Sequence, residues 1–316
     1  MVSVRNIQGL TVSNLTLGTV QLGMNYGIAN KAGKPSRESG FSILRTAVEG
    51  GINSFDTAAQ YGDSEDVLGQ FFSVPANRPD PLILSTKLDL LPGEVGEQPD
   101  PGQLERVLRG HVEQSLRRLG LNKLPIYLLH RADDVTRYGR SLSRILSRVQ
   151  RENLLGQIGV SVYTSAEVDA VLADDVYRVI QIPMNVLDHR LTESGAMQRM
   201  QDRGIAIFVR SVFLQGLFFK KPEELGGNLT IAREPVRLLQ QMADREGLSV
   251  AQLAIAYIRD LKGVASLVIG AETTDQLREN MMLIESPAIG EKTRSEIRKS
   301  FAGLPETILN PGLWRL

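Results

Sequence analysis

The chain has 316 residues, and its 36 basic and 36 acidic side chains give a formal net charge of zero. This balance argues against nucleic-acid or acidic-membrane binding, because both require a basic excess. The absence of cysteine excludes disulfides, thiolate nucleophiles and cysteine-ligated metal sites, and no apolar run approaches the ~20 residues of a transmembrane helix.

The remaining compositional features predict an ordinary globular protein with 42% hydrophobic residues. The N-terminal residues show no signal-peptide pattern, so we expect a cytoplasmic protein. Three histidines without HExxH spacing predict no metal site. The length suits one (β/α)8 barrel, for which about 250 residues are typical, and we expect residues 1–316 to form a single domain, as a monomer or weak homo-oligomer.

Eight apolar, often β-branched runs along the chain predict strands. Before them, residues 2–13 alternate apolar and polar side chains around Gly9 and predict a short hairpin. Helical periodicity separates the strands. It is clearest over residues 36–51 and 104–120, and Gly120 is well placed to end the second helix. The predicted strands are residues 15–22, 51–58, 81–88, 125–130, 156–162, 177–184, 204–212 and 264–271.

The segments after the seventh and eighth strands differ in pattern. Residues 213–230 lack periodicity and carry three glycines and a proline, which predicts a long irregular loop of the kind that is often functional. Residues 273–284 and 291–301 predict two helices, and the tail around Trp314 reads as irregular.

Continuous apolar strands that alternate with helices favour a parallel sheet covered by helices. Eight such units favour closure. The predicted fold is therefore α/β, a (β/α)8 TIM barrel with an N-terminal β-hairpin cap and a C-terminal extra helix and tail. A doubly wound open sheet is the alternative.

An acid, a phenol, an amine and an imidazole stand at the ends of three successive predicted strands. Asp56 and Tyr61 lie in INSFDTAAQYG, Lys87 in STKLD and His130 in IYLLHR. In a parallel barrel these ends meet on one face, where active sites lie. Each residue alone is commonly a packing, capping or solvated group, but the four together in this order predict a proton-relay site.

The combination suits proton transfer to a carbonyl oxygen. A free phenol titrates near pH 10, and a neighbouring ammonium favours the phenolate. We therefore expect Tyr61 to be the acid/base and Lys87 to tune it. Asp56 would be the partner of the lysine, and His130 would orient the carbonyl.

The order and contexts of these four residues resemble the catalytic tetrad of the aldo-keto reductases. The most specific segment is DTAxxYGxSExxLG, at residues 56–69. The segments LGTVQLGMNYG, SLRRLGLNKLPIYLLHR, GQIGVSVY, VIQIPMN and IGAETTDQLREN follow the family order. The resemblance covers most of the chain. It implies a nicotinamide-dependent oxidoreductase that interconverts an aldehyde or ketone and an alcohol.

The resemblance also implies residues that bind the cofactor. It sets Gly18 and Thr19 against the nicotinamide, and Ser161 and Gln181 on its carboxamide; strand-end hydrogen bonding is the ordinary alternative for the last two. No GxGxxG occurs, which fits a family that binds nicotinamide without a Rossmann fold. The blocks that follow the seventh and eighth strands would hold the pyrophosphate and adenosine, through Ser211, Leu214, Gly216, Leu217, Gly270, Ala271, Thr273, Gln276, Glu279 and Asn280, with Asn280 on the adenine.

Three positions depart from the family pattern. Val162 follows Ser161 where the family often has Asn, which removes one carboxamide ligand. Arg210 stands where an aromatic residue often stacks on the nicotinamide. Its guanidinium can also stack, or bind an anionic substrate or the cofactor phosphates, while a surface position is the alternative. Glu272 and Gln276 stand where NADP-dependent members usually carry Arg or Lys. A carboxylate repels a 2′-phosphate but accepts hydrogen bonds from a ribose diol, so of NAD(H) and NADP(H) we favour NAD(H).

The opening GTVQLGMNYGIANKAGKPS resembles family members associated with sugar metabolism, which implies a small-molecule carbonyl substrate that is a sugar or polyol. Two rival functions stay open: a cofactor-binding regulatory subunit, and a cofactor-retaining sugar epimerase. We expect the loop 213–230 to help shape the substrate pocket together with Gln21, Asn25, Tyr26, Arg131 and Trp314, with loop packing as the alternative for at least two of these.

Overall fold

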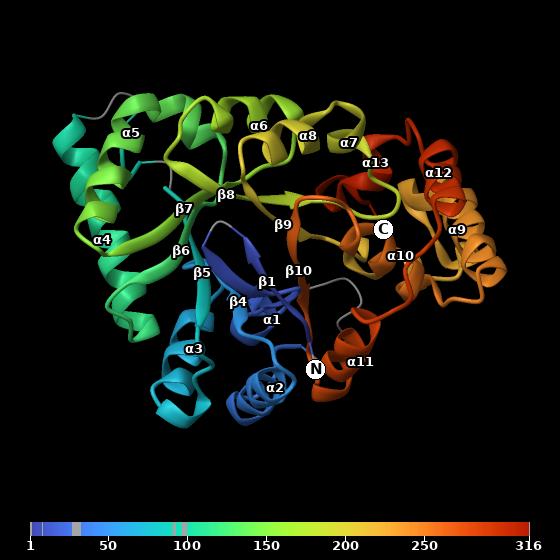
Figure 1. Cartoon of the computed structure of the whole chain (residues 1–316), viewed down its shortest axis with the longest axis horizontal. Coiled ribbons are helices and arrows are strands. Elements are labelled where there is room, and N and C mark those ends of the chain that lie inside the picture. The colour runs from blue at the N-terminus through green and yellow to red at the C-terminus, as the bar shows by residue number, and fades with distance from the viewer. Residues whose placement is uncertain (1, 8, 27–32, 91–92, 97–99, 316) are drawn as a thin grey trace.

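The computed structural model of the protein describes residues 2–7, 9–26, 33–90, 93–96 and 100–315. Eight parallel strands close into a barrel in the order β10-β3-β4-β5-β6-β7-β8-β9, which confirms the predicted (β/α)8 barrel and excludes the open sheet. Helices ring the strands (Figure 1). The barrel strands are β3 (Leu15–Gly18), β4 (Ser54–Asp56), β5 (Ile83–Leu88), β6 (Leu124–Leu129), β7 (Leu155–Ser161), β8 (Tyr177–Pro183), β9 (Ala206–Arg210) and β10 (Val264–Gly270).

The predicted N-terminal hairpin is present and closes one end of the barrel. Strands β1 (Val4–Ile7) and β2 (Leu10–Ser13) pair antiparallel, and Gly9 between them has φ +76°, a left-handed conformation that glycine adopts without steric cost. Leu10 and Val12 pack against apolar side chains from the barrel strands. The hairpin therefore lies across the amino-terminal end of the barrel (Figure 1).

The helices begin and end at the residues that the sequence favours. The first clear helix, α2 (Arg37–Glu49), follows Ser36, whose side chain accepts a hydrogen bond from the backbone N–H of Ser39. Helix α4 (Pro101–Leu119) ends at Gly120, which has φ +63° as predicted. The others are α1 (Val20–Gly23), α3 (Ser64–Phe72), α5 (Asp133–Arg151), α6 (Ser165–Leu172), α7 (Arg190–Glu193), α8 (Ala196–Asp202), α9 (Arg233–Arg245), α10 (Val250–Arg259), α11 (Thr274–Leu283), α12 (Glu291–Ser300) and α13 (Glu306–Leu309), with the 3₁₀ segment η1 (Pro75–Asn77).

Two sequence predictions need correction. The segment 213–230 is a loop, as predicted, but it is only partly irregular, because it contains the 3₁₀ segments η2 (Leu214–Phe219), η3 (Pro222–Glu224) and most of η4 (Gly227–Ala232). Such short helices, with three residues per turn, leave no 3.6-residue pattern in the sequence. The tail likewise contains α13 and η5 (Pro311–Leu313), so it is only partly irregular.

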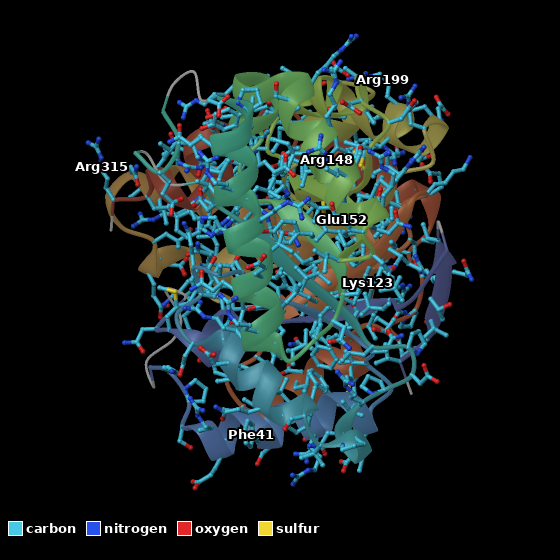
Figure 2. The ribbon with its side chains drawn as sticks, turned by 90° about the vertical axis from the view of Figure 1, so that its left-hand side faces the viewer. Phe41, Lys123, Arg148, Glu152, Arg199 and Arg315 are labelled. Carbon is cyan, nitrogen blue, oxygen red and sulfur yellow. The ribbon has the colours of Figure 1, made fainter. Side chains whose placement is uncertain are left out.

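Ion pairs join neighbouring helices at the surface. Arg148 on α5 contacts Glu105 on α4 at 2.7 Å, and Arg109 on α4 contacts Glu152 after α5 at 2.6 Å. Figure 2 shows Arg148 and Glu152 on this face of the molecule. Exposed pairs of this kind contribute little stability, typically below about 1 kcal/mol each. In the described part of the chain, no helix combines the length and the apolar character needed to cross a membrane.

Candidate active site

The four residues predicted to form a proton relay gather at the carboxyl ends of β4, β5 and β6. Asp56 ends β4, Lys87 lies near the end of β5, and His130 follows β6 directly. Tyr61 lies in the turn that follows β4. The Nζ atom of Lys87 is 4.9 Å from the centre of the Tyr61 ring, and the rings of Tyr61 and His130 lie edge to face with centres 6.0 Å apart. Barrel closure therefore brings all four side chains together.

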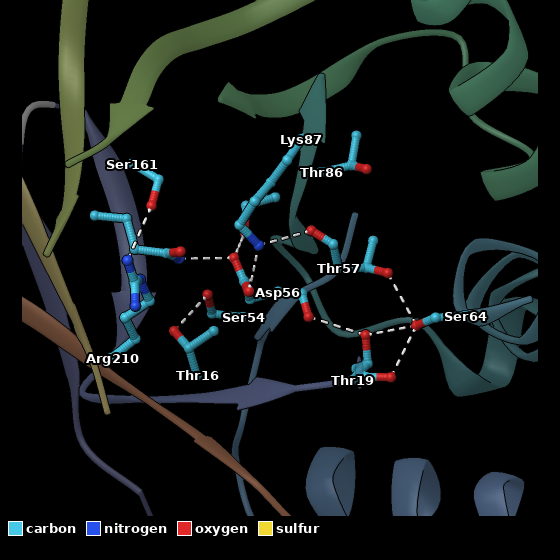
Figure 3. Close-up of polar contacts among 12 residues, drawn as sticks. Thr16, Thr19, Ser54, Asp56, Thr57, Ser64, Thr86, Lys87, Ser161 and Arg210 are labelled. Carbon is cyan, nitrogen blue, oxygen red and sulfur yellow. Dashed lines mark hydrogen bonds and ion pairs between the residues drawn. The ribbon is translucent and has the colours of Figure 1, made fainter. Parts of the chain in front are cut away.

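Asp56 and Lys87 form a buried ion pair, and both carboxylate oxygens of Asp56 accept hydrogen bonds. Lys87 Nζ donates to Asp56 Oδ2 at 2.6 Å and to the carbonyl of Thr57 at 2.9 Å (Figure 3). The Oδ1 atom of Asp56 accepts from Ser85 Oγ at 2.7 Å and from Gln181 Nε2 at 2.9 Å. Burial alone would lower the pKa of Lys87, since only 1% of its side chain is exposed, but the Asp56 carboxylate and the Tyr61 side chain outweigh burial and raise it. Lys87 is therefore an ammonium held in the protein interior.

His130 is neutral over most of the pH range. Burial lowers its pKa to about 4, and the positive charge of Lys87 adds to this effect. Its Nδ1 atom has no hydrogen-bond partner among the described residues, and the closest carboxylate oxygen, on Asp89, lies 4.0 Å away. A neutral imidazole in this place can donate one hydrogen bond and carries no charge into the site.

Two glycines set the position of the turn that carries Tyr61. A Cβ on Gly23 would lie 1.7 Å from the carbonyl oxygen of Tyr61, and a Cβ on Gly62 would lie 2.2 Å from the carbonyl oxygen of Gly23. Gly62 also has φ +58°. Only glycine at both positions lets the turn approach α1 this closely.

A buried hydroxyl network holds the same turn from behind. Ser64 Oγ contacts the Thr19 hydroxyl at 2.8 Å, accepts from Thr57 Oγ1 at 2.9 Å and donates to the carbonyl of Thr19 at 3.0 Å (Figure 3). Glu65, the next residue, accepts from Thr86 Oγ1 at 2.6 Å. The serine and glutamate of the segment DTAxxYGxSExxLG thus hold the turn that carries Tyr61, beneath the cavity.

A cavity of about 680 Å³ opens above these residues and extends to α11. Its wall includes three of the four relay residues, whereas Lys87 lies behind them. The other predicted site residues that line it are Gly18, Thr19, Gln21, Tyr26, Ser161, Gln181, Arg210, Ser211, Gly216, Gly270, Glu272, Gln276, Glu279 and Asn280.

Four of the predicted cofactor residues lie outside the cavity wall. Leu214 and Leu217 are fully buried in the hydrophobic core, as is Ala271, because apolar side chains in this block turn inward. Thr273 instead caps α11, its side chain accepting a hydrogen bond from the Gln276 N–H.

Three of the predicted substrate residues also lie outside the wall. The side-chain oxygen of Asn25 accepts from the Lys34 N–H at 2.7 Å. Arg131 donates to the carbonyl of Leu90 at 2.7 Å, and Trp314 packs against the core. Asn25 thus has its partner between the same two helices, α1 and α2, Arg131 has its partner after β5, and Trp314 is held by the core.

The position after Ser161 explains one departure from the family pattern. Val162 is fully buried in the core, so this side chain faces away from the cavity. Tyr163, two residues after Ser161, lines the cavity instead. The wall also includes Phe213, Gln215 and Phe219. These three belong to the segment 213–230, which was expected to help shape the pocket, whereas Tyr163 and Ser85 are residues that the sequence analysis missed. Because residues two apart along a strand point to the same side of the sheet, Ser161 could have indicated Tyr163 and Lys87 could have indicated Ser85.

In the described part of the chain, no group of three or more His, Cys, Asp or Glu side chains could hold a metal ion.

Comparisons with known proteins agree on one family. A model described as the aldo/keto reductase family matches residues 14–300. The chain is 29% identical to L-glyceraldehyde 3-phosphate reductase of Escherichia coli strain K12, over 92% of this chain and 90% of that protein. It is 24% identical to norsolorinic acid reductase B of Dothistroma septosporum, over 96% of this chain and 82% of that protein. Among solved structures, the holo form of an aldo-keto reductase from Bacillus halodurans superposes with a TM-score of 0.76 at 23% identity, covering 95% of this chain and 96% of that one, which shows a shared fold.

Proposed function

The chain belongs to the aldo/keto reductase family and is therefore an NAD(P)-dependent oxidoreductase that interconverts a carbonyl compound and an alcohol, and we propose that Tyr61 is its acid/base. The supporting observation is the buried Lys87 ammonium, 4.9 Å from the centre of the Tyr61 ring. A cation at this distance stabilises negative charge on the phenol oxygen as its proton leaves. Tyr61 thus gives its proton to the carbonyl oxygen in reduction and takes it back in oxidation.

His130 positions the carbonyl in this proposal. Because its pKa is about 4, it approaches the substrate oxygen as a neutral donor and does not compete with Tyr61 to deliver a proton near neutral pH. Its ring lies edge to face with that of Tyr61, and both residues line the cavity.

The cavity has the features that a nicotinamide dinucleotide requires. A bound nicotinamide supplies or accepts the hydride. The N-terminus of α11 borders the cavity, and helix N-termini attract phosphate oxygens. Gly270 also leaves room for the side-chain amide of Gln21, because a Cβ atom at position 270 would lie only 2.4 Å from it. We assign Gly18, Thr19 and Ser161 to the nicotinamide end, and the wall residues of α11 to the adenosine end.

The charges along the wall favour NAD(H) over NADP(H). Glu272 and Glu279 both line the α11 end. Among the wall residues that the structure describes, Arg210 is the only Lys or Arg. Burial raises the pKa of the Glu272 carboxyl, and no neighbouring cation offsets this effect. A 2′-phosphate would meet acidic side chains there, whereas a ribose diol would find hydrogen-bond acceptors.

For the substrate we propose a sugar or polyol. The polar side chain of Gln21 and the rings of Tyr26 and Tyr163 line the cavity, and sugars combine polar edges with apolar faces that pack on such rings. The Escherichia coli relative is named for L-glyceraldehyde 3-phosphate, a carbonyl compound of the sugar class.

The test is Tyr61→Phe, assayed by NADH and NADPH absorbance with a panel of aldehydes, sugars and polyols. We expect turnover to fall by roughly 10²- to 10⁴-fold, the usual contribution of general acid–base catalysis, with cofactor dissociation constants little changed. Tyr138→Phe is the matched control, since it removes a phenol hydroxyl of the same kind from a tyrosine on α5 that lies outside the cavity wall. Retained turnover in Tyr61→Phe would remove Tyr61 from its role.

A further inference from the structure

Arg210 is a cation in the cavity wall without an acidic partner. It ends β9, and its side chain is half-buried. Within the described residues, no carboxylate lies within ion-pair distance of its guanidinium. Among the described residues, its polar side-chain contact is with Ser161 Oγ at 3.5 Å, long for a hydrogen bond (Figure 3). A guanidinium carries five donors, so most of the hydrogen-bonding capacity of Arg210 is not used within the described residues.

None of the carboxylates in the described cavity wall forms an ion pair with Arg210. Both oxygens of Asp56 accept hydrogen bonds from Lys87, Ser85 and Gln181. Glu272 is affected by burial and by no neighbouring cation, so it does not neutralise Arg210. The positive charge therefore remains available to a ligand.

Arg210 lies at the end of the cavity that holds the proton relay. Its guanidinium stacks over the Tyr163 ring at 4.4 Å. Burial and the charge of Lys87 lower the pKa of His130, and the charge of Arg210 adds to this effect. Burial and Tyr61 raise the pKa of Tyr26, and Arg210 opposes them. The charge of Arg210 thus reaches His130 of the relay and Tyr26 in the cavity wall.

Resting on the proposed function, we propose that Arg210 binds a carboxylate or phosphate carried by the substrate, so that the substrate is an anionic sugar-sized carbonyl compound or alcohol. A planar guanidinium matches both oxyanions in a two-point contact. The stack on Tyr163 holds that plane in place, and the exposed rings of Tyr163, Tyr26 and Phe219 give the rest of the ligand an apolar surface. The phosphates of the cofactor offer the same chemistry, but Arg210 contacts Ser161 at the nicotinamide end of the cavity, whereas the N-terminus of α11 is the place proposed for the phosphates.

The first experiment compares two aldehydes that differ in charge and little in shape, 4-carboxybenzaldehyde and 4-formylbenzamide, each reduced with NADH. We expect the wild type to favour the carboxylate in kcat/KM by roughly 10- to 100-fold, the usual effect of a hydrogen bond to a charged group. Arg210→Gln should bring that ratio close to one, mainly through KM, and Arg210→Lys should restore it in part. Arg144→Gln, an exposed change of the same charge on α5, should keep the wild-type ratio.

Two results would overturn the inference. One is a wild-type ratio already close to one. The other is equal loss for both aldehydes in Arg210→Gln together with weaker NADH binding by fluorescence titration, which would assign Arg210 to the cofactor phosphates.

A binding measurement separates this inference from the proposed function. The same aldehydes are titrated calorimetrically into the protein with saturating NAD⁺, which cannot reduce them. Preferential binding of the carboxylate that is lost in Arg210→Gln would support the anion site even if no carbonyl compound turned over, in which case only the proposed function would fail. Equal binding of the two aldehydes to the wild type would overturn the anion site whatever the turnover.

Discussion

Replacing Asp56 with Asn should strongly destabilise the protein, because the three donors around this carboxylate leave no tolerable orientation for an amide. Ser85 and Gln181 donate to Oδ1, and Lys87 donates to Oδ2. An amide NH2 at the Oδ1 position would face the donors of Ser85 and Gln181, and at the Oδ2 position it would face the Lys87 ammonium. Removing one partner of a buried ion pair costs about 3–5 kcal/mol of unfolding free energy.

The pH dependence of this cost follows from Lys87. Without its counter-ion, burial would favour neutral Lys87 in the folded variant, while the unfolded chain keeps the ordinary lysine pKa of about 10.4. Deprotonating the Lys87 ammonium at pH 7 costs about 5 kcal/mol, so the destabilisation caused by Asp56→Asn cannot exceed about this value. Because the unfolded variant then binds one more proton than the folded variant, the stability of the variant rises with pH until the pH reaches the ordinary lysine pKa of about 10.4. The cost should shrink by about 3 kcal/mol between pH 7 and pH 9.

The assay is chemical denaturation of four proteins at pH 7 and pH 9: the wild type, Asp56→Asn, Lys87→Met and the double variant. The double variant removes both charges, so it should be more stable than the sum of the two single changes predicts, by an amount on the order of 1–3 kcal/mol. Its turnover should remain lost, since the ammonium near Tyr61 is gone. Additive costs, or an Asp56→Asn cost below about 1 kcal/mol at both pH values, would refute the buried charged pair.

Three further predictions concern the cofactor, the imidazole and the Tyr61 turn. Glu272→Arg should shift the ratio of NADPH to NADH affinity toward NADPH by roughly 10-fold or more, measured by fluorescence titration, since it replaces a repelling charge with a phosphate-binding one; an unchanged ratio would mean that Glu272 does not face the ribose. His130 has a folded pKa of about 4, below its ordinary 6.5, so the stability it contributes is present above pH 6.5 and is lost as the pH falls toward 4. Asp134, with a pKa raised to about 6, acts in the opposite sense, so the unfolding free energy of the wild type must be compared with that of His130→Gln at each pH. The difference between the two proteins should change by about 2–3 kcal/mol between pH 7 and pH 4.5. A difference that stays constant would contradict the low pKa of His130. Gly62→Ala should lower both the denaturation midpoint and turnover, because φ is +58° there and the new Cβ would lie 2.2 Å from the Gly23 carbonyl oxygen; wild-type turnover would show that the turn can move without displacing Tyr61.

Local sequence signals were enough to predict the barrel and the order of its relay residues. Eight apolar runs separated by helical periodicity predicted the closed sheet, and Gly120 ended its helix as expected. Asp56, Lys87 and His130 could be placed because the end of an apolar strand is visible in the sequence, and parallel strands must present their ends on one face.

The tertiary structure decided what each side chain touches. Gln181 meets Asp56 across 125 positions of sequence, a contact that exists only because the barrel closes. Asn25 and Arg131 turn away from the cavity because Lys34 and Leu90 offer them partners, and no local pattern records such choices. Arg210 was visible in the sequence as a departure from the family pattern, but that it lies over Tyr163 without a neighbouring carboxylate depended on loops that follow different strands. Strand identity and strand-end position are local properties of a sequence, whereas the direction of a loop side chain is set by partners that only the folded chain brings within reach.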